Sequence, residues 1–199
     1  MKFLRKIIYC FLLLVVLLIL VYFIFFSRKY PITLITHSFY PGDSLDSWHG
    51  VVVYNNGAEY ANSYGKNYSP DSFYYGKKWQ CVEFVKRYYH DHLNFIFRDG
   101  MGHAKQFFDQ RLKQGELNKR RGMIQFINGG NERPKVDDIL IFDGEFGHVA
   151  IVTSVEQDAV NVIQQNIFMT PRQQFLLTCL NGKYTVGEGR RPMGWLRRP

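Results

Sequence analysis

Residues 75–84 read Tyr-Gly-Lys-Lys-Trp-Gln-Cys-Val-Glu-Phe, and this stretch says more about the fold than any other part of the 199-residue sequence. Apolar residues then recur at helical spacing on Cys81, Phe84, Val85, Tyr88 and Tyr89. The spacing predicts a helix over residues 79–93 with one apolar face. Cys81 falls at its opening, where unpaired N–H groups and the helix dipole favour a thiolate, so we expect a depressed pKa for this thiol.

A histidine, His148, lies on one of the strands expected later in the chain and is a candidate base for the Cys81 thiol. Residues 139–142, 148–155 and 160–165 have the pattern of buried strands. His148 is the first residue of the second of these strands. A thiol at a helix start, a histidine on a later strand and a polar group beside the imidazole are the requirements of papain-like chemistry.

Gln164 is the expected polar partner of His148. An odd-length hairpin loop centred near Glu156 would place the two residues directly opposite each other on one face of the sheet. An even loop would turn Gln164 to the other face. Asn166 shares the face of Gln164, and Gln165 does not.

The remaining pattern is that of one α+β domain without repeats. Residues 51–54 predict a short strand, residues 60–76 a long ordered loop and residues 103–114 a second short helix. Helices therefore come first and an antiparallel set of strands follows. We expect the domain to cover residues 51–199, with residues 30–50 as a linker that packs onto it.

The N-terminal segment, residues 1–29, is predicted to be a membrane anchor. Residues 7–26 carry no charge and are long enough as a helix to cross about 30 Å of hydrocarbon. The run is longer than a typical signal peptide core and lacks a small-residue cleavage site, so we expect it to stay uncleaved. Lys2, Arg5 and Lys6 face Arg28 and Lys29 across it. This small positive excess favours a cytoplasmic N-terminus and a single-pass protein whose domain lies in the periplasm or outside the cell.

Net charge excludes a nucleic-acid-binding surface. The formal charge is +8, but residues 31–189 hold 16 basic and 17 acidic residues. The excess lies at the two ends, and we expect the basic tail from Arg190 to Arg198 to be a solvated terminus. A protein that tracks phosphates needs a basic face on its folded part. No nucleic-acid partner is therefore expected.

Cysteines and histidines give no sign of a disulfide framework or a metal. Besides Cys81 the chain has Cys10, inside the apolar run, and Cys179. His90 and His92 point to different sides of a helix, so they do not form a metal pair. A free thiol in a domain outside the cytoplasm needs a reason, and catalysis is one.

Taken together, these residues resemble the CHAP amidase domain family. The likeness lies in the 75–84 run, in Gly147-His148-Val149-Ala150-Ile151-Val152 and in Gln164-Gln165-Asn166. It extends from about Trp48 to Trp195 and is strongest to the amidase half of bifunctional glutathionylspermidine synthetase/amidases. The resemblance implies a papain-like fold, with a nucleophilic cysteine and a histidine base, but no cofactor.

Carried over residue by residue, the resemblance makes Cys81 the nucleophile and His148 the base. The third member is usually acidic in the family, in an E-x-N arrangement, and here it is Gln164 with Asn166 retained. The Cys81 backbone N–H, with the Gln80 side chain, is expected to receive the oxyanion. Glu83 and Lys86 are the candidates for substrate contact, with Lys86 standing where the glutathionylspermidine enzymes commonly have an arginine.

Three functions remain open from the sequence. The first is hydrolysis of a peptidoglycan amide or peptide cross-link, which an anchor facing outward favours. The second is hydrolysis of a glutathionylspermidine-type amide, which the sequence likeness favours. The third is a catalytically weakened domain that only binds cell-wall or peptide ligands, because Gln164 replaces an acid. We expect the protein to be a monomer.

Overall fold

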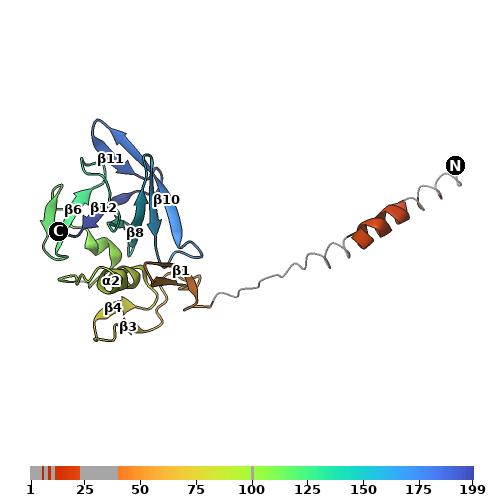
Figure 1. Cartoon of the computed structure of the whole chain (residues 1–199), viewed down its shortest axis with the longest axis horizontal. Coiled ribbons are helices and arrows are strands. Elements are labelled where there is room, and N and C mark those ends of the chain that lie inside the picture. The colour runs from red at the N-terminus through yellow and green to blue at the C-terminus, as the bar shows by residue number, and fades with distance from the viewer. Residues whose placement is uncertain (1–5, 7–8, 10–11, 23–39, 100) are drawn as a thin grey trace. The chain divides into compact units, whose positions relative to one another are not determined.

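A computed structural model describes residues 6, 9, 12–22, 40–99 and 101–199 of the chain, which divides into two units, Met1–Ser38 and Phe39–Pro199 (Figure 1). In the first unit residues 12–22 are helical. Among the described residues no helix has the length and hydropathy that a membrane span requires. Residues 7–8, 10–11 and 23–26 of the predicted anchor lie outside the described residues.

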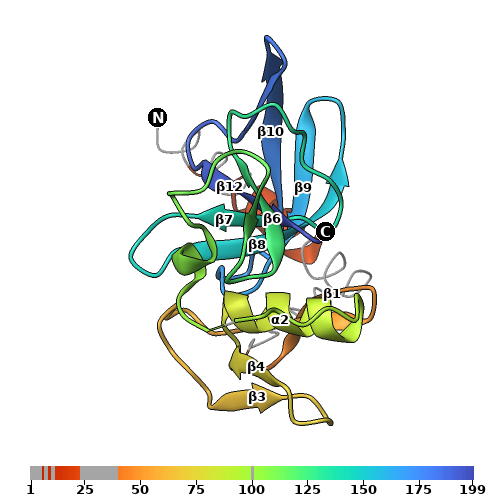
Figure 2. The same cartoon turned by 90° about the vertical axis from the view of Figure 1, so that its left-hand side faces the viewer.

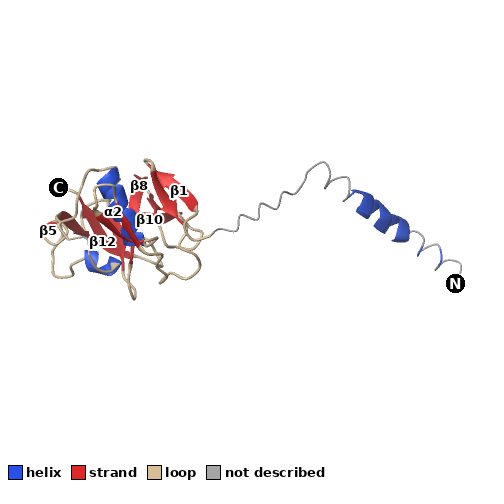
Figure 3. Ribbon diagram, turned by 90° about the horizontal axis from the view of Figure 1, so that it is seen from below, coloured by secondary structure: helices blue, strands red, loops and turns tan. Residues whose placement is uncertain are grey.

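The body of the second unit is an eight-stranded antiparallel sheet, seen as red arrows in Figure 3. The strand order is β11-β10-β9-β8-β7-β12-β6-β5, so the last strand of the chain, β12, inserts between β7 and β6. The bounds are β5 (Glu116–Asn118), β6 (Met123–Ile127), β7 (Ile139–Phe142), β8 (His148–Val155), β9 (Ala159–Ile163), β10 (Arg172–Leu180), β11 (Lys183–Val186) and β12 (Pro192–Arg197).

The α-helix α2 (Cys81–Asp91) crosses one side of this sheet (Figure 2). Two small hairpins accompany it: β1 (Ser44–Trp48) with β2 (Val51–Tyr54), and β3 (Lys66–Tyr68) with β4 (Tyr74–Lys77). A short 3₁₀ helix, η1 (Ala104–Phe107), packs against β7 and β8. The described part of the domain is therefore α+β, with far more strand than helix.

The core has two parts, one on each face of the sheet. Under α2, the side chains of Phe84, Val85 and Tyr88 pack with strand residues such as Ile151, all fully buried. On the opposite face Trp195 of β12 is the largest buried side chain. Burying each such apolar side chain contributes about 1.5–3 kcal/mol, so the start of α2 is held firmly against β8.

The predicted helix over residues 103–114 is wrong beyond the short 3₁₀ turn at its start. Two buried side-chain amides take the backbone groups that a helix would have used. Asn118 donates to the Phe107 carbonyl (3.0 Å), and the amide of Gln125 bonds both the N–H and the carbonyl of Asp109 (2.9 and 2.8 Å). The chain therefore continues as turns toward β5.

Two boundaries differ from the sequence expectations. Residues 44–48 form β1 and pair with β2, so the domain begins before residue 51 and includes this part of the expected linker. Residues 30–39 of that linker lie outside the described residues. The expected loop over residues 60–76 contains the β3–β4 hairpin. The strands expected over residues 139–142 and 148–155 are confirmed, and the next one ends at Ile163.

Candidate active site

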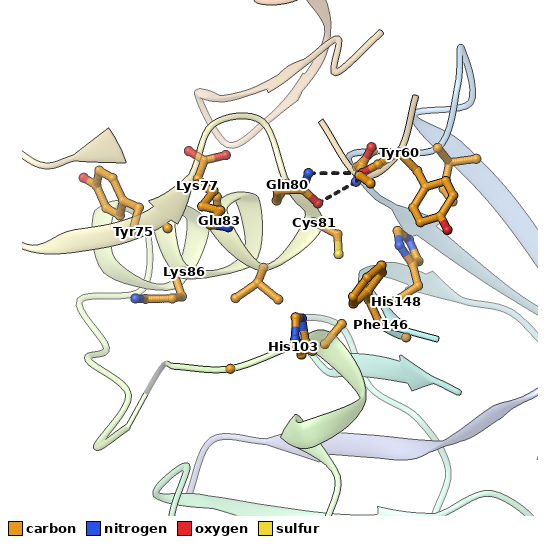
Figure 4. A pocket seen from close by; sticks show the side chains of 18 of the residues that line it. Tyr60, Tyr75, Lys77, Gln80, Cys81, Glu83, Lys86, His103, Phe146 and His148 are labelled. Atoms are coloured by element: carbon orange, nitrogen blue, oxygen red, sulfur yellow. Dashed lines mark hydrogen bonds between the residues drawn. The ribbon is translucent and has the colours of Figure 1, made fainter. Parts of the chain in front are cut away.

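A pocket of about 630 Å³ lies where the start of α2 meets the start of β8. Cys81 and His148 both line it, and Figure 4 shows the sulfur and the imidazole directed into the same space. The rest of the wall comes from α2, β4, the turn before η1 and the segments that precede β8 and follow β9, together with Tyr60, Ala61 and Arg190. The structure thus brings together the two residues that the sequence assigned to the chemistry.

Cys81 is the first residue of α2 and is 7% exposed. Gln80 precedes it in an extended conformation, and its side chain makes no capping hydrogen bond to the helix. The first N–H groups of α2 are therefore left without a side-chain cap. The backbone N–H groups of Cys81, Val82 and Val149 approach the sulfur closely enough to favour the thiolate.

His148 is held at the start of β8 by the residue before it. Gly147 has a φ of +72°, and a Cβ built there would lie 2.5 Å from the backbone nitrogen of Lys105. Only glycine therefore allows η1 to pack this closely, with the Lys105 N–H donating to the Phe146 carbonyl (3.1 Å). His148 itself is 4% exposed.

Gln164 contacts His148, but not in the register that was expected. Near the turn Val155 pairs with Val160, an even loop that alone would turn Gln164 to the opposite face. The register then shifts between Val152 and Ser154, which makes Thr153 the extra residue of a β-bulge. The bulge returns Gln164 to the face of His148 as a diagonal neighbour rather than a directly opposite one. A long side chain spans such a diagonal.

The hydrogen bonds of Gln164 fix the tautomer of His148. The amide nitrogen donates to the carbonyl of Thr170 (3.1 Å), which can only accept. Its oxygen, Oε1, therefore faces His148 Nε2 at 3.0 Å and needs a proton from it. The ring consequently carries its hydrogen on Nε2, and Nδ1 has the free lone pair of a base.

Burial sets the resting protonation of both groups. It raises the pKa of the Cys81 thiol, and the backbone N–H groups and Arg190 oppose this only in part. It also lowers the pKa of His148 to about 4, with Arg190 adding to the shift and the Gln164 hydrogen bond opposing it. The expectation of a depressed thiol pKa is therefore wrong for the free protein. Burial therefore favours a neutral thiol and a neutral imidazole in the free protein.

Gln80 and Asn166 hold a surface loop rather than an oxyanion. The nitrogen of Gln80 donates to the carbonyls of Tyr60 (3.1 Å) and Asn62 (2.5 Å), and its oxygen accepts from Asn166 (2.7 Å). Both N–H groups of the Gln80 amide are thus already used. The expected oxyanion donor from this side chain is not free here, which leaves the backbone N–H of Cys81.

Glu83 lines the pocket but is fully occupied by protein groups. Its oxygens accept from Arg87 Nε, Asn67 and Gln165, each at 2.7 Å, and the residue is 0% exposed. Gln165 also accepts from the N–H of Tyr54 (2.8 Å). Glu83 therefore ties α2 to its neighbours, and the protein groups bonded to its oxygens argue against the expected contact with substrate.

Lys86 also lines the pocket, although the residue is almost entirely buried. Its ammonium group donates to the carbonyl of Tyr74 and lies over the rings of Phe73 and Tyr74, 5.1 and 5.0 Å from their centroids. Within the described part of the chain it has no carboxylate partner. Burial lowers its pKa to about 8. Figure 4 shows Lys86 at the end of the pocket away from His148.

Several lining residues had escaped the sequence reasoning. Tyr60, His103 and Phe146 form an aromatic wall, with the rings of His103 and Phe146 4.9 Å apart. Arg190 also lines the pocket, although it was taken for part of a solvated tail. The position of Phe146 two residues before His148 was a usable signal. The positions of Tyr60 and Arg190 depend on contacts between distant parts of the chain, which no local pattern carries.

The chain is similar to a known domain family and to several known proteins. Residues 70–166 match the family model of the CHAP domain. The chain is 32% identical over 160 residues to "Bifunctional glutathionylspermidine synthetase/amidase" of Escherichia coli (strain K12), and equally to that of Shigella flexneri. It is 26% identical over 120 residues to "Trypanothione synthetase" of Crithidia fasciculata.

These alignments cover 70% of this chain for the two bacterial proteins and 58% for the third, but only 25% and 18% of the relatives themselves. The chain therefore spans about a quarter of the length of the two bacterial relatives and 18% of the length of the Crithidia fasciculata protein. The matched residues include Cys81, His148 and Gln164, whereas the pocket residues Tyr60, Phe168 and Arg190 lie outside the match. Residues 70–166 accordingly belong to the CHAP domain family, and the chain is homologous to the amidase domain of the E. coli protein.

Proposed function

We propose that this protein is an amide hydrolase that uses Cys81 as its nucleophile and His148 as its base. One observation carries the proposal. The locked Gln164 amide directs the unprotonated Nδ1 of His148 toward the pocket that holds the thiol at the start of α2. A base whose tautomer is fixed, beside a thiol at a helix N-terminus, is the arrangement that thioester chemistry needs. The family match supports the same conclusion at the level of amide hydrolysis.

The reaction starts from the neutral pair. As the sulfur attacks the carbonyl carbon of the amide, its proton passes to His148 Nδ1, and the carbonyl oxygen becomes an oxyanion that the Cys81 backbone N–H receives. The imidazolium donates from Nε2 to Gln164 throughout. It then gives the Nδ1 proton to the departing nitrogen, so that the C–N bond breaks and an amine leaves. A water molecule, deprotonated by His148 Nδ1, then attacks the thioester. The acyl group leaves as a carboxylic acid, and the sulfur takes back the proton to restore the thiol.

Two amide classes compete as substrates. The relatives' names point to a glutathionylspermidine-type amide, while an anchored domain outside the cytoplasm would meet peptidoglycan peptides. Lys86, a buried ammonium without a carboxylate partner in the described structure, supports a substrate with an anionic end in either class. A binding-only domain remains the rival, and it is favoured by the neutral resting state of Cys81 and His148.

We also propose that residues 7–26 anchor the chain in a membrane. The support comes from the sequence, in which these residues are uncharged and numerous enough to span a bilayer as a helix. The domain would then act outside the cytoplasm, on substrates that reach the membrane surface.

The hydrolase proposal can be tested on the full-length chain in detergent. Peptidoglycan fragments and glutathionylspermidine are incubated with it separately, and products and protein are analysed by mass spectrometry. We expect an amine product together with an acyl adduct on Cys81, and no turnover by Cys81→Ser or His148→Ala. Cys179→Ser is the matched control, because this cysteine is exposed on β10. Ligand binding without cleavage or adduct would establish the binding-only alternative.

A further inference from the structure

We propose that the pocket selects an anionic amide, with Arg190 binding a carboxylate next to the scissile bond, and that it excludes a polyamine. This rests on the proposed amidase function and names its substrate class. The argument starts from the charges that line the pocket. Lys77, Lys86 and Arg190 are cationic, and Glu83 is the only acid among the lining residues. The carboxylate of Glu83 is already neutralised by Arg87.

Positive charge therefore prevails among the groups that line the pocket, although the carboxylate of Asp99, which is paired with Arg120, also acts on Lys86. Neither Lys77, Lys86 nor Arg190 has an ion pair with any described residue. Glu145, beside the aromatic wall, is not a lining residue and accepts a hydrogen bond from the Tyr60 hydroxyl (3.0 Å). An ammonium group entering the pocket would meet like charges and no unpaired carboxylate among the lining residues, whereas a carboxylate would be attracted.

Arg190 is the cation next to the reacting groups. It comes from the loop between β11 and β12, and its guanidinium lies over the ring of Phe142, 5.0 Å from the centroid. The Phe142 ring is 6.1 Å from that of His148. Among the described residues Arg190 makes no hydrogen bond, so all its donors remain available. A guanidinium with free donors is suited to a bidentate bond with a carboxylate.

The turn that carries Arg190 is built to hold it there. Gly187 has a φ of +81°, and a Cβ at that position would lie 2.6 Å from the carbonyl oxygen of Arg190. The next residue, Arg191, points elsewhere, donates to the carbonyl of Glu188 (2.9 Å) and does not line the pocket. Arg190 and Arg191 therefore form a matched pair, in which one guanidinium faces the site and the other does not.

The charge preference can be measured without knowing the substrate. Methanethiosulfonate reagents carrying a sulfonate, a methyl group or a trimethylammonium group label thiols and differ in charge. Rates at Cys81 of the full-length chain are read by mass spectrometry, with the exposed Cys179 as the internal reference. We expect the anionic reagent to outpace the cationic one at Cys81, and Arg190→Gln to lower that rate ratio about tenfold. Arg191→Gln should leave it unchanged.

Hydrolysis then tests the substrate class itself. Glutathionyl amides of 4-aminobutyrate, butylamine and putrescine differ mainly in the charge of the leaving amine. We expect kcat/KM to be highest for the 4-aminobutyrate amide, lower for the butylamine amide and lowest for the putrescine amide. Arg190→Gln should reduce the differences in kcat/KM among the three amides, whereas Arg191→Gln should leave them unchanged.

The two proposals fail in different ways. A preference for the putrescine amide, or equal effects of the Arg190 and Arg191 substitutions, would overturn the anionic-substrate inference while leaving the hydrolase intact. Charge-selective labelling of Cys81 without cleavage of any amide or of peptidoglycan would overturn the hydrolase, and the substrate assignment with it.

Discussion

Both the oxygen and the nitrogen of the Gln164 amide form hydrogen bonds, and a carboxylate at this position could not form all of them. The oxygen accepts from His148, while the nitrogen donates to the Thr170 carbonyl and to Gln173 Oε1, each at 3.1 Å. A carboxylate at this position would hold His148 more strongly but would face the Thr170 carbonyl without a proton to give. The local backbone therefore favours an amide at residue 164.

Gln164→Glu should expose this compromise. A hydrogen bond to a charged group contributes about 1.5–3 kcal/mol, against about 0.5–1.5 kcal/mol for a neutral one. The carboxylate should thus stabilise the imidazolium by about 1 kcal/mol, which is roughly fivefold in the thiolate–imidazolium population. We expect about fivefold faster alkylation of Cys81 at pH 7 and several-fold higher turnover. The free energy of unfolding should fall by about 1–3 kcal/mol, because the Thr170 carbonyl loses its donor.

Gln164→Ala serves as the opposite variant. Nothing would then fix the tautomer of His148, so both alkylation and turnover should fall below wild type. The measurements are the pH profile of alkylation and chemical denaturation. A pH profile that is the same in wild type and both variants would show that Gln164 does not act on His148.

His148 should make the folded protein sensitive to acid. Its pKa is about 4 in the folded state and about 6.5 when unfolded. Between these values the unfolded chain binds a proton that the folded chain does not, so stability is complete above about pH 6.5 and is lost as pH falls toward 4. The shift corresponds to about 3 kcal/mol.

The test is urea denaturation between pH 4 and 7.5. We expect His148→Gln to flatten this part of the stability profile, whatever its effect at pH 7.5. The variant His90→Gln controls for histidines in general, since His90 lies near the surface and pairs with Asp71 and Asp91. A profile that keeps its full slope in His148→Gln would mean that other groups cause the acid sensitivity.

At the scale of elements, α2 is positioned by a buried ion pair. Glu83 and Arg87 lie one turn apart, and Arg87 also donates to the Val52 carbonyl of β2 (2.7 Å). Through Asn67 and Gln165 the same carboxylate reaches β3 and the segment after β9. Four separate parts of the chain therefore meet at Glu83, directly behind the nucleophile.

Glu83→Gln should act through stability and not through substrate affinity. It leaves the Arg87 guanidinium buried without a counter-charge, and breaking a buried pair in this way costs about 3–5 kcal/mol. We expect a loss of that size in the free energy of unfolding, with little change in KM for the protein that remains folded. Glu59→Gln, on the exposed surface, should change neither quantity. A raised KM with stability intact would return Glu83 to the substrate-binding residues.

The elements also show where sequence reasoning reached its limit. The helix from Cys81 and the strand from His148 follow from local periodicity, and both are present. The helix predicted over residues 103–114 does not form, because the buried side-chain amides of Asn118 and Gln125 bond the backbone of this segment. Likewise the pairing of Gln164 with His148 could be anticipated from parity, but the bulge at Thr153 that produces it could not. Hydrogen bonds from side chains beyond the segment decided the first outcome, and a register shift between β8 and β9 decided the second.

For the whole molecule, the basic residues at the two ends have different roles. Arg197 in β12 forms ion pairs with Glu132 (2.5 Å) and Asp138 (2.8 Å), and Arg190 lines the pocket. The expectation that the C-terminal basic residues form a solvated tail is therefore wrong for Arg197, whereas Arg190 is exposed but also lines the pocket. The five basic residues of the first 30 flank the apolar run instead, where charge bears on topology.

The orientation of the chain is the prediction with the widest consequence. Lys2, Arg5 and Lys6 precede the apolar run, and only Arg28 and Lys29 follow it, so the N-terminus should stay in the cytoplasm and the domain should lie outside. A phosphatase fused after Pro199 should then be active, and a cytoplasm-dependent fluorescent reporter at the same site should stay dark. Replacing Lys2, Arg5 and Lys6 with glutamine leaves the positive excess on the other side of the apolar run and should reduce or invert this pattern of reporter activity.

Cytoplasmic fluorescence of the unmodified chain would place the domain with the cytosolic thiol pool and favour a glutathione-type amide over peptidoglycan as the substrate. Release of the full-length chain from membranes by alkaline carbonate would rule out the anchor itself.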